Sequence, residues 1–137
     1  MIGLDDLLVR FGERELAERT DRENASEIDF DVVQRAIDDA VAEADSYVRA
    51  AGIMRLSQPS PALKGYVCDI ARWRIYDDAA SEIVEQRYKL AIEWLKFASK
   101  HPAMLDDTLA VLTSEERNRT GCAVEPNKPP DWSDYAA

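Results

Sequence analysis

Apolar residues recur every three or four positions over the stretch 30–51, the longest helical pattern in the chain. This spacing places them on one face of a helix and leaves mostly acidic residues on the outer face. Asp29 stands where a helix cap is favoured, and Gly52 ends the pattern. We therefore expect a long amphipathic helix. Its apolar face consists of Val33, Ile37, Ala40, Val41, Ala44, Tyr47 and Val48.

The stretch 60–78 predicts a second helix, which we place at the centre of the fold. Ser60 can cap it by accepting a hydrogen bond from an amide of the first turn, and Pro61 suits the first helical position. Its apolar side chains form one packed face. Leu63, Val67 and Ile70 fall on one side at helical spacing, and Tyr66, Ala71 and Trp73 flank them.

Arg74 falls on the same line of the central helix as Leu63 and Val67. A guanidinium group on an apolar line must either extend to solvent or meet a carboxylate. We predict that Arg74 is largely buried and forms a pair with Asp45 of the long helix.

A third long helix is expected over residues 81–100, and its apolar residues fall on two lines. The first line forms a core face. The second line either belongs to the core as well or contacts another chain, since a small domain has few partners for it. The first line is Val84, Tyr88, Ala91, Leu95 and Ala98, and the second is Ile83, Leu90, Trp94 and Phe97.

The two outer long helices carry opposite charges, because the stretch 81–100 is net basic and the stretch 30–51 is acidic. The acidic face is either simply solvated or a surface for a partner. If the second apolar line contacts a neighbouring chain, these charges would set the register of the contact. The predicted subunit interface consists of Leu90, Trp94, Phe97, Arg87, Lys89 and Lys96 on one chain and Asp38, Asp39 and Glu43 on the next.

The polar loop before the long helix has a partial calcium-binding pattern. Asp21, Glu23 and Asp29 match oxygen-ligand positions of an EF-hand loop. Ser26 replaces the turn glycine of that motif, and Val32 replaces its bidentate acid. We therefore expect an acidic connector that does not bind calcium.

Pro102 ends the third long helix, because proline disfavours helical geometry in the residue before it. We divide the chain there into a helical domain, residues 1–102, and a C-terminal arm, residues 103–137, which is extended or ordered only on assembly. Trp132 and Tyr135 near the end of the arm favour docking on another surface. A frayed tail is the other interpretation.

The composition narrows the classes of function. A chain of 137 residues is long enough for one domain, and 46% hydrophobic residues favour a globular protein. The net charge of −10 disfavours binding to nucleic acids or to an anionic membrane surface. Cys68 and Cys122 are expected to be free thiols in a reducing compartment. No apolar run reaches the roughly 20 residues that a membrane span needs.

Catalytic signatures are missing from the sequence. There is no Gly-rich phosphate loop and no Cys-x-x-Cys motif, and His101 is the single histidine. We therefore expect no enzyme and no cofactor. The whole pattern predicts an all-α protein, a small bundle of two long helices around a central helix. Short N-terminal helices over about 4–11 and 13–19 and an extended C-terminal arm complete it.

Several stretches resemble the small neck proteins of Mu-like phages and prophages. They are LDDLLVRFGERELAERTDRE, the end EADSYV of the long helix, ALKGYVCDIARWRIYDD and RYKLAIEWL. The resemblance covers about residues 4–98, and CDIARWRIYD is its most specific part. The acidic loop has ENAS where related proteins often have a DGDG-like sequence, and we identify no similarity for the chain after Pro102.

The resemblance implies a structural virion protein, a ring-forming head–tail connector also described as an adaptor or head-completion protein. It implies a homo-oligomeric ring, twelvefold to match the portal protein, with a tail-side neck or tail-terminator protein on its other side. DNA would pass through without specific binding. The protein would move from the host cytoplasm to the neck of the virion. The residues alone leave open a small acidic interaction or regulatory module that acts as a monomer or dimer.

Overall fold

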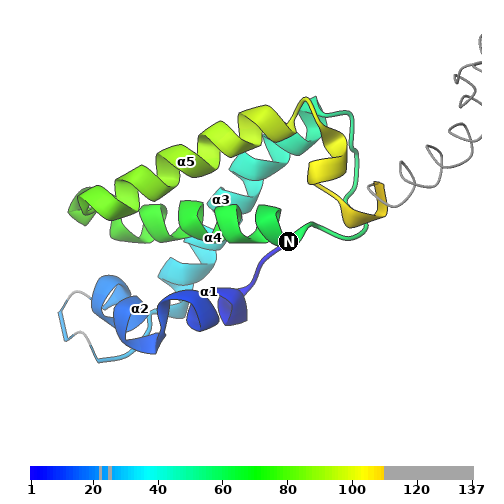
Figure 1. Ribbon diagram of the computed structural model, residues 1–137. Coiled ribbons are helices and arrows are strands. Elements are labelled where there is room, and N and C mark those ends of the chain that lie inside the picture. The colour runs from blue at the N-terminus through cyan, green and yellow to red at the C-terminus, as the bar shows by residue number, and fades with distance from the viewer. Residues whose placement is uncertain (22, 25, 110–137) are drawn as a thin grey trace, which may run out of the picture.

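The computed structural model describes residues 1–21, 23–24 and 26–109, which form an arrangement of helices (Figure 1). Within these ranges there is no β-strand, and an isolated bridge joins Pro59 to Asp106. The predicted all-α class is therefore confirmed. The helices are α1 (Leu4–Phe11), α2 (Glu13–Thr20), α3 (Phe30–Ala50), α4 (Pro61–Tyr76) and α5 (Glu82–Ala98), with 3₁₀ turns η1 (Asp77–Ala79) and η2 (Pro102–Met104).

The helices begin where the sequence places their caps. The side chain of Asp29 accepts hydrogen bonds from the backbone amides of Asp31 and Val32 at the start of α3. The hydroxyl of Ser60 accepts one from the amide of Leu63 at the start of α4. These bonds satisfy amides that have no partner within the helix, so they fix where each helix starts. None of the described helices is long and apolar enough to span a bilayer.

The predicted central position of α4 is confirmed. In Figure 1 this helix lies between α5 on one side and α1 with α2 on the other, and α3 crosses behind it. It packs most extensively against α3 and α5. As a result α4 is buried on nearly every side. Its buried residues are Leu63, Gly65, Val67, Cys68, Asp69, Ile70, Ala71, Ile75 and Tyr76.

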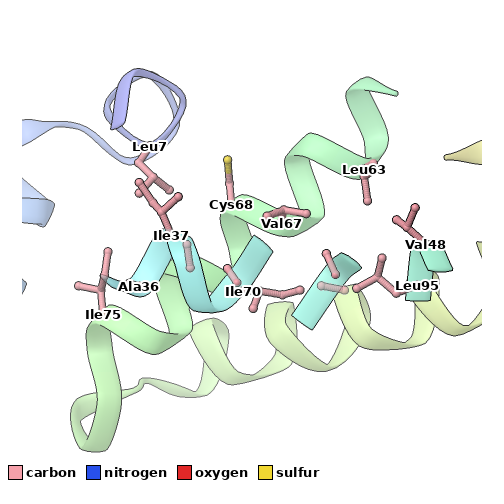
Figure 2. Packing of buried hydrophobic residues seen from close by; sticks show 14 of the residues in the cluster. Leu7, Ala36, Ile37, Val48, Leu63, Val67, Cys68, Ile70, Ile75 and Leu95 are labelled. Carbon is pink, nitrogen blue, oxygen red and sulfur yellow. The ribbon is translucent and has the colours of Figure 1, made fainter. Parts of the chain in front are cut away.

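The core joins the apolar faces of α1, α3, α4 and α5 in one cluster. Figure 2 shows part of it, with Ile75 of α4 toward one end and Val48 of α3 and Leu95 of α5 toward the other. Cys68 is a free, buried thiol in this cluster, and its burial raises the pKa of the thiol to about 11. The predicted core residue Tyr47 is only half-buried at the edge of the cluster.

The helical domain continues past Pro102, where the sequence analysis ended it. Leu105 is completely buried in the core, and its carbonyl accepts a hydrogen bond of 3.0 Å from the amide of Ser60. The hydroxyl of Ser60 also donates to the carbonyl of Met104 at 2.7 Å. Residues 103–109 therefore belong to the domain, which corrects the predicted boundary. The rest of the predicted arm lies outside the described residues.

Asp106 fastens this C-terminal segment to the loop that precedes α4. Its carboxylate accepts hydrogen bonds from the amides of Ser57 at 2.7 Å, Gln58 at 3.3 Å and Thr108 at 2.8 Å. Burial by itself would raise the pKa of Asp106, but these amide donors together hold the pKa below its ordinary value. The carboxylate therefore stays ionised and joins two segments of the chain.

Candidate protein–protein interface

The second apolar line of α5 lies on the surface of the described domain. Leu90 and Phe97 are each 55% exposed, and Ile83 of the same line is more exposed still. The core-facing side of α5 is taken by the buried side chains of Val84, Ala91, Leu95 and Ala98. With 3.6 residues per turn, Leu90 and Phe97 lie about 100° or more round the helix from Ala91. Within the described part of the chain, this line is therefore covered only at Trp94 and by a ring contact of Phe97 with His101, whose centroids lie 4.4 Å apart.

Trp94 differs from the other members of this line because it is half-buried. Its ring stacks on that of Tyr66 in α4, with centroids 4.8 Å apart, and it packs against the core. Trp94 therefore joins the exposed line to the surface of α4.

The three predicted interface cations of α5 lie in different places. Arg87 lies on the side of the line nearest α4, where it lines a hollow together with Asp69. Lys89 and Lys96 are exposed. Lys89 directly precedes Leu90 and Lys96 directly precedes Phe97, so each lysine points about 100° away from that apolar residue around the helix axis. Arg87 is therefore the cation most closely associated with the apolar line.

Two of the three predicted acidic partners on α3 are exposed. Asp39 is exposed on α3, and Asp38 is exposed while accepting a hydrogen bond of 2.9 Å from the side chain of Gln34. Both remain accessible to another chain.

The third predicted acidic partner, Glu43, is used within the subunit. Its carboxylate lies 3.5 Å from a terminal guanidinium nitrogen of Arg74, and the hydroxyl of Tyr88 donates to it at 3.2 Å. It thus connects α3, α4 and α5, which removes it from the predicted intersubunit set.

The predicted pair of Arg74 with Asp45 is wrong. Asp45 instead pairs with Arg49 one turn along α3, at 2.9 Å. Glu43 and Asp45 are two positions apart, so they point about 200° apart round the helix, and only Glu43 faces α4. The side chain of Arg74 is also 33% exposed, so it is less buried than predicted.

Glu43, Arg74 and Tyr88 form one cluster, the Glu43 cluster, in which Tyr88 is the member from α5. Its ring stacks on that of Trp73 with centroids 4.0 Å apart and an interplanar angle of 12°. Burial raises the pKa of Tyr88, and the negative charge of Glu43 and the hydrogen bond to it raise this pKa further. The Nε of Arg74 is buried and has no hydrogen-bond partner, so one polar atom of this cluster remains unsatisfied.

A polar hollow at the junction of α1, α4 and α5 was not predicted from the sequence. This hollow has two parts, of ≈ 290 and ≈ 300 Å³. Both parts are lined by Arg10, Asp69 and Arg87. Asp69 is 8% exposed. Burial raises the pKa of its carboxyl, and the nearby arginines, Arg87 foremost, reduce this shift without cancelling it. No sequence spacing connects these residues, since each belongs to a different helix.

The acidic loop is organised by hydrogen bonds to its own backbone. The carboxylate of Asp21 accepts from the amides of Asn24 at 3.1 Å and Ser26 at 3.5 Å, while Asp29 caps α3 as predicted. Glu23 is exposed. Among the residues that the structure describes, no three side chains of the types that bind metals lie close enough together to hold an ion.

These surfaces define the chain as a small all-α protein whose candidate sites are suited to contacts with other proteins. The family model described as Bacteriophage Mu, Gp36 matches residues 2–121 of it. Because this match covers most of the chain, the protein belongs to the Mu Gp36 family and is a protein of Mu-like phages. No curated protein matches the chain.

Proposed function

We propose that this protein is a ring-forming head–tail connector, or adaptor, which joins the portal to the tail and surrounds the DNA channel. The observation that carries the proposal is the apolar line of α5, in which Ile83, Leu90 and Phe97 remain more than half exposed. An exposed apolar line on a small domain marks a surface that contacts another protein. Membership of the Mu Gp36 family supports a structural or morphogenetic role in a phage.

A closed ring requires two different patches on each subunit that fit one another. The apolar line of α5 with Arg87 at its edge is one such patch. The exposed acidic face of α3, with Asp38 and Asp39, is the other. We place the α5 line of one subunit against the α3 face of the next. Trp94 lies at the rim, and Lys89 or Lys96 approaches the same acids. The ring is twelvefold to match the portal.

The charge of the protein suits a channel through which DNA moves. With a net charge of −10, a ring of these subunits would repel phosphate groups rather than bind them. We place the portal protein on one side of the ring and a tail-side neck or tail-terminator protein on the other. In this role the protein acts without catalysis or a cofactor. It is present in the host cytoplasm during assembly and in the neck of the virion afterwards.

The test is a double substitution on the exposed line, Leu90→Ser with Phe97→Ser. We expect the full-length variant to keep its helical circular dichroism and melting temperature but to lose the joining of heads to tails in negative-stain images. The matched control is Val9→Ser with Met54→Ser, which removes two apolar side chains that are even more exposed and lie outside the α5 line. Trp94→Ala is a poorer probe, because Trp94 also stacks on Tyr66.

The alternative function, a small acidic interaction or regulatory module, makes a different prediction. Such a module would keep the mass of a monomer or dimer both alone and with the portal protein. If, in addition, the Leu90→Ser, Phe97→Ser variant joined heads to tails with the same efficiency as the unaltered protein, the connector proposal would be wrong.

A further inference from the structure

The hollow at the junction of α1, α4 and α5 contains two arginines without a direct partner. Arg10 comes from the last turn of α1 and Arg87 from α5, on either side of α4 in Figure 1. Neither forms an ion pair or a hydrogen bond with any residue that the structure describes. The third arginine nearby, Arg72, is already held by Glu15 through two bonds of 3.0 and 2.8 Å.

Asp69 lies in the same hollow and attracts both free arginines without bonding to them. No described residue donates a hydrogen bond to its carboxylate, and Arg87 and Arg10 act on it only through their charge. Gly65 makes room for Arg10, because a Cβ atom at this position would lie 2.6 Å from the Nη2 of Arg10. The two guanidinium groups thus converge on one hollow with hydrogen-bond donors still available.

The hollow is locally positive on an otherwise acidic protein. Arg10, Arg72 and Arg87 contribute three positive charges, against two negative charges from Asp69 and Glu15. The chain as a whole carries a net charge of −10. Carboxylates are therefore the groups that this hollow favours, and arginine pairs bind them through charge-assisted hydrogen bonds.

The hollow continues into the apolar line of α5. Tyr66 lines one of its two parts and stacks on Trp94, which belongs to that line. Leu90 and Phe97 lie further along the same line and are more than half exposed. An occupant of the hollow needs carboxylates for the arginines and aromatic or apolar side chains for the Tyr66–Trp94 stack.

Residues 131–135 of this chain, DWSDY, have that combination. Each aspartate is followed directly by an aromatic residue: Asp131 by Trp132, and Asp134 by Tyr135. The two aspartates are three positions apart, and so are the two aromatic residues. The segment lies 22 residues beyond Leu109, and at about 3.3–3.6 Å per residue an extended chain of that length reaches about 75 Å. Because a domain of about 100 residues has a radius of gyration of only about 13 Å, the segment can reach a neighbouring subunit.

We propose that the hollow of Arg10, Asp69 and Arg87 is the docking site for residues 131–135 of a neighbouring copy of this chain. The two aspartates of the segment bind the free arginines, and its aromatic rings pack against Tyr66 and Trp94, beside the part of the α5 line that meets the next subunit. This inference rests on the proposed ring, since it requires a second copy. It identifies the surface that receives the arm.

The experiment uses the full-length chain with the photocrosslinker p-benzoylphenylalanine in place of Trp132. Isotopically light and heavy copies are mixed, so that crosslinks between copies are separated from those within one copy. We expect crosslinks between copies that map to the region around Tyr66 and Arg87. The double charge reversal Arg10→Glu with Arg87→Glu should lower their yield by roughly tenfold or more, because close charge pairs are strongly coupled.

The same full-length chain provides the matched variants. Adding Asp131→Arg with Asp134→Arg to the double reversal should restore the crosslinks. Arg55→Glu with Lys64→Glu, which reverses two exposed charges outside the hollow, should leave the yield unchanged. Asp69→Asn should increase the yield, because it removes the negative charge that competes with the incoming aspartates.

Three outcomes would overturn the docking proposal. They are crosslinks only within one copy, crosslinks between copies at a different surface, and a double reversal that has no effect. If heads and tails are joined normally while any of these is observed, the docking site alone is wrong. If head–tail joining does not depend on the α5 line, the proposed connector function is wrong, whatever the crosslinks show.

Discussion

Two buried aspartates use their carboxylates in different ways: Asp106 binds the loop that precedes α4, and Asp69 lies in the middle of α4. Asp106 is 2% exposed and accepts hydrogen bonds from three backbone amides, which hold its pKa below the ordinary value despite its burial. Asp69 is 8% exposed and has no hydrogen-bond donor among the described residues, so burial raises its pKa. Both carboxyls are almost inaccessible to solvent, yet their pKa values shift in opposite directions, since Asp106 has three amide donors and Asp69 lies deeper in the protein without one.

The difference separates a structural site from an available one. The carboxylate of Asp106 is occupied by three backbone amides, so this site serves to close the fold. Arg10 and Arg87 beside Asp69 have no direct partner among the described residues, so they retain donors for another chain. The Glu43 cluster belongs with Asp106 in this comparison, since its carboxylate is occupied by Arg74 and Tyr88.

The largest effect on folding is expected from Asp106→Ala. This substitution leaves the amides of Ser57, Gln58 and Thr108 without their acceptor, and each buried amide left unpaired costs about 1–3 kcal/mol. We expect the free energy of unfolding, measured in urea, to fall by about 2–4 kcal/mol, less than the sum because water reaches part of the loop. Asp107→Ala is the control, since Asp107 is exposed. Equal effects of the two substitutions would contradict the structural role of Asp106.

The stability that Asp106 contributes should also depend on pH in a defined direction. Because its pKa in the folded state is lowered, the contribution is present above the pKa of an unfolded aspartate, about 3.9, and is lost as the pH falls through the folded value. The difference in unfolding free energy between the unaltered protein and Asp106→Asn should therefore narrow in acid. A constant difference between pH 6 and about pH 2 would argue against an ionised Asp106.

An intermediate effect is expected in the Glu43 cluster. Arg74→Met leaves Glu43 half-buried with Tyr88 as its remaining partner, and we expect a loss of about 1–3 kcal/mol in the free energy of unfolding. Asp45→Asn removes only the surface pair with Arg49 and should cost less than about 1 kcal/mol. A double-mutant cycle in urea should show coupling of Arg74 with Glu43 and none with Asp45. The reverse result would restore the pair predicted from the sequence.

A smaller effect, of opposite sign, is expected at Asp69. Because its pKa in the folded state is raised, Asp69 favours folding only when it is protonated, and this contribution is lost as the pH rises through the folded value. Asp69→Asn should therefore raise the free energy of unfolding at pH 7 by up to about 1 kcal/mol and have little effect below about pH 3.9. Thermal melts across this range measure the difference. Destabilisation by Asp69→Asn at pH 7 would show that Asp69 pairs like Asp106.

The smallest effect on folding is expected from the two free arginines. Arg10→Ala and Arg87→Ala should each change the free energy of unfolding by no more than about 0.5 kcal/mol, as is usual for surface substitutions. Arg72→Ala is the comparison, because Arg72 binds Glu15 and its guanidinium lies 4.6 Å from the ring centroid of Phe11. If Arg10→Ala or Arg87→Ala destabilised the domain as much as Arg72→Ala does, the arginines of the hollow would be structural.

Local features of the sequence determined the helices themselves. The periodicity of apolar residues and the caps at Asp29 and Ser60 predicted α3 and α4 with nearly correct bounds, because both signals act within a few residues. The same periodicity placed a second apolar line on α5, whereas the packing of the other helices decided that this line is exposed. The sequence also predicted the central position of α4, but its burial on several sides became visible only in the structure.

Only the tertiary structure decided which groups from different helices meet. The rotation of α3 about its axis presents Glu43 rather than Asp45 to Arg74, and a sequence does not specify that rotation. The burial of Leu105 and the convergence of Arg10 with Arg87 on Asp69 likewise depend on how distant segments pack. Periodicity fixes the faces of each helix, whereas the pairing of those faces is set by packing and by the donors that each buried carboxylate can reach.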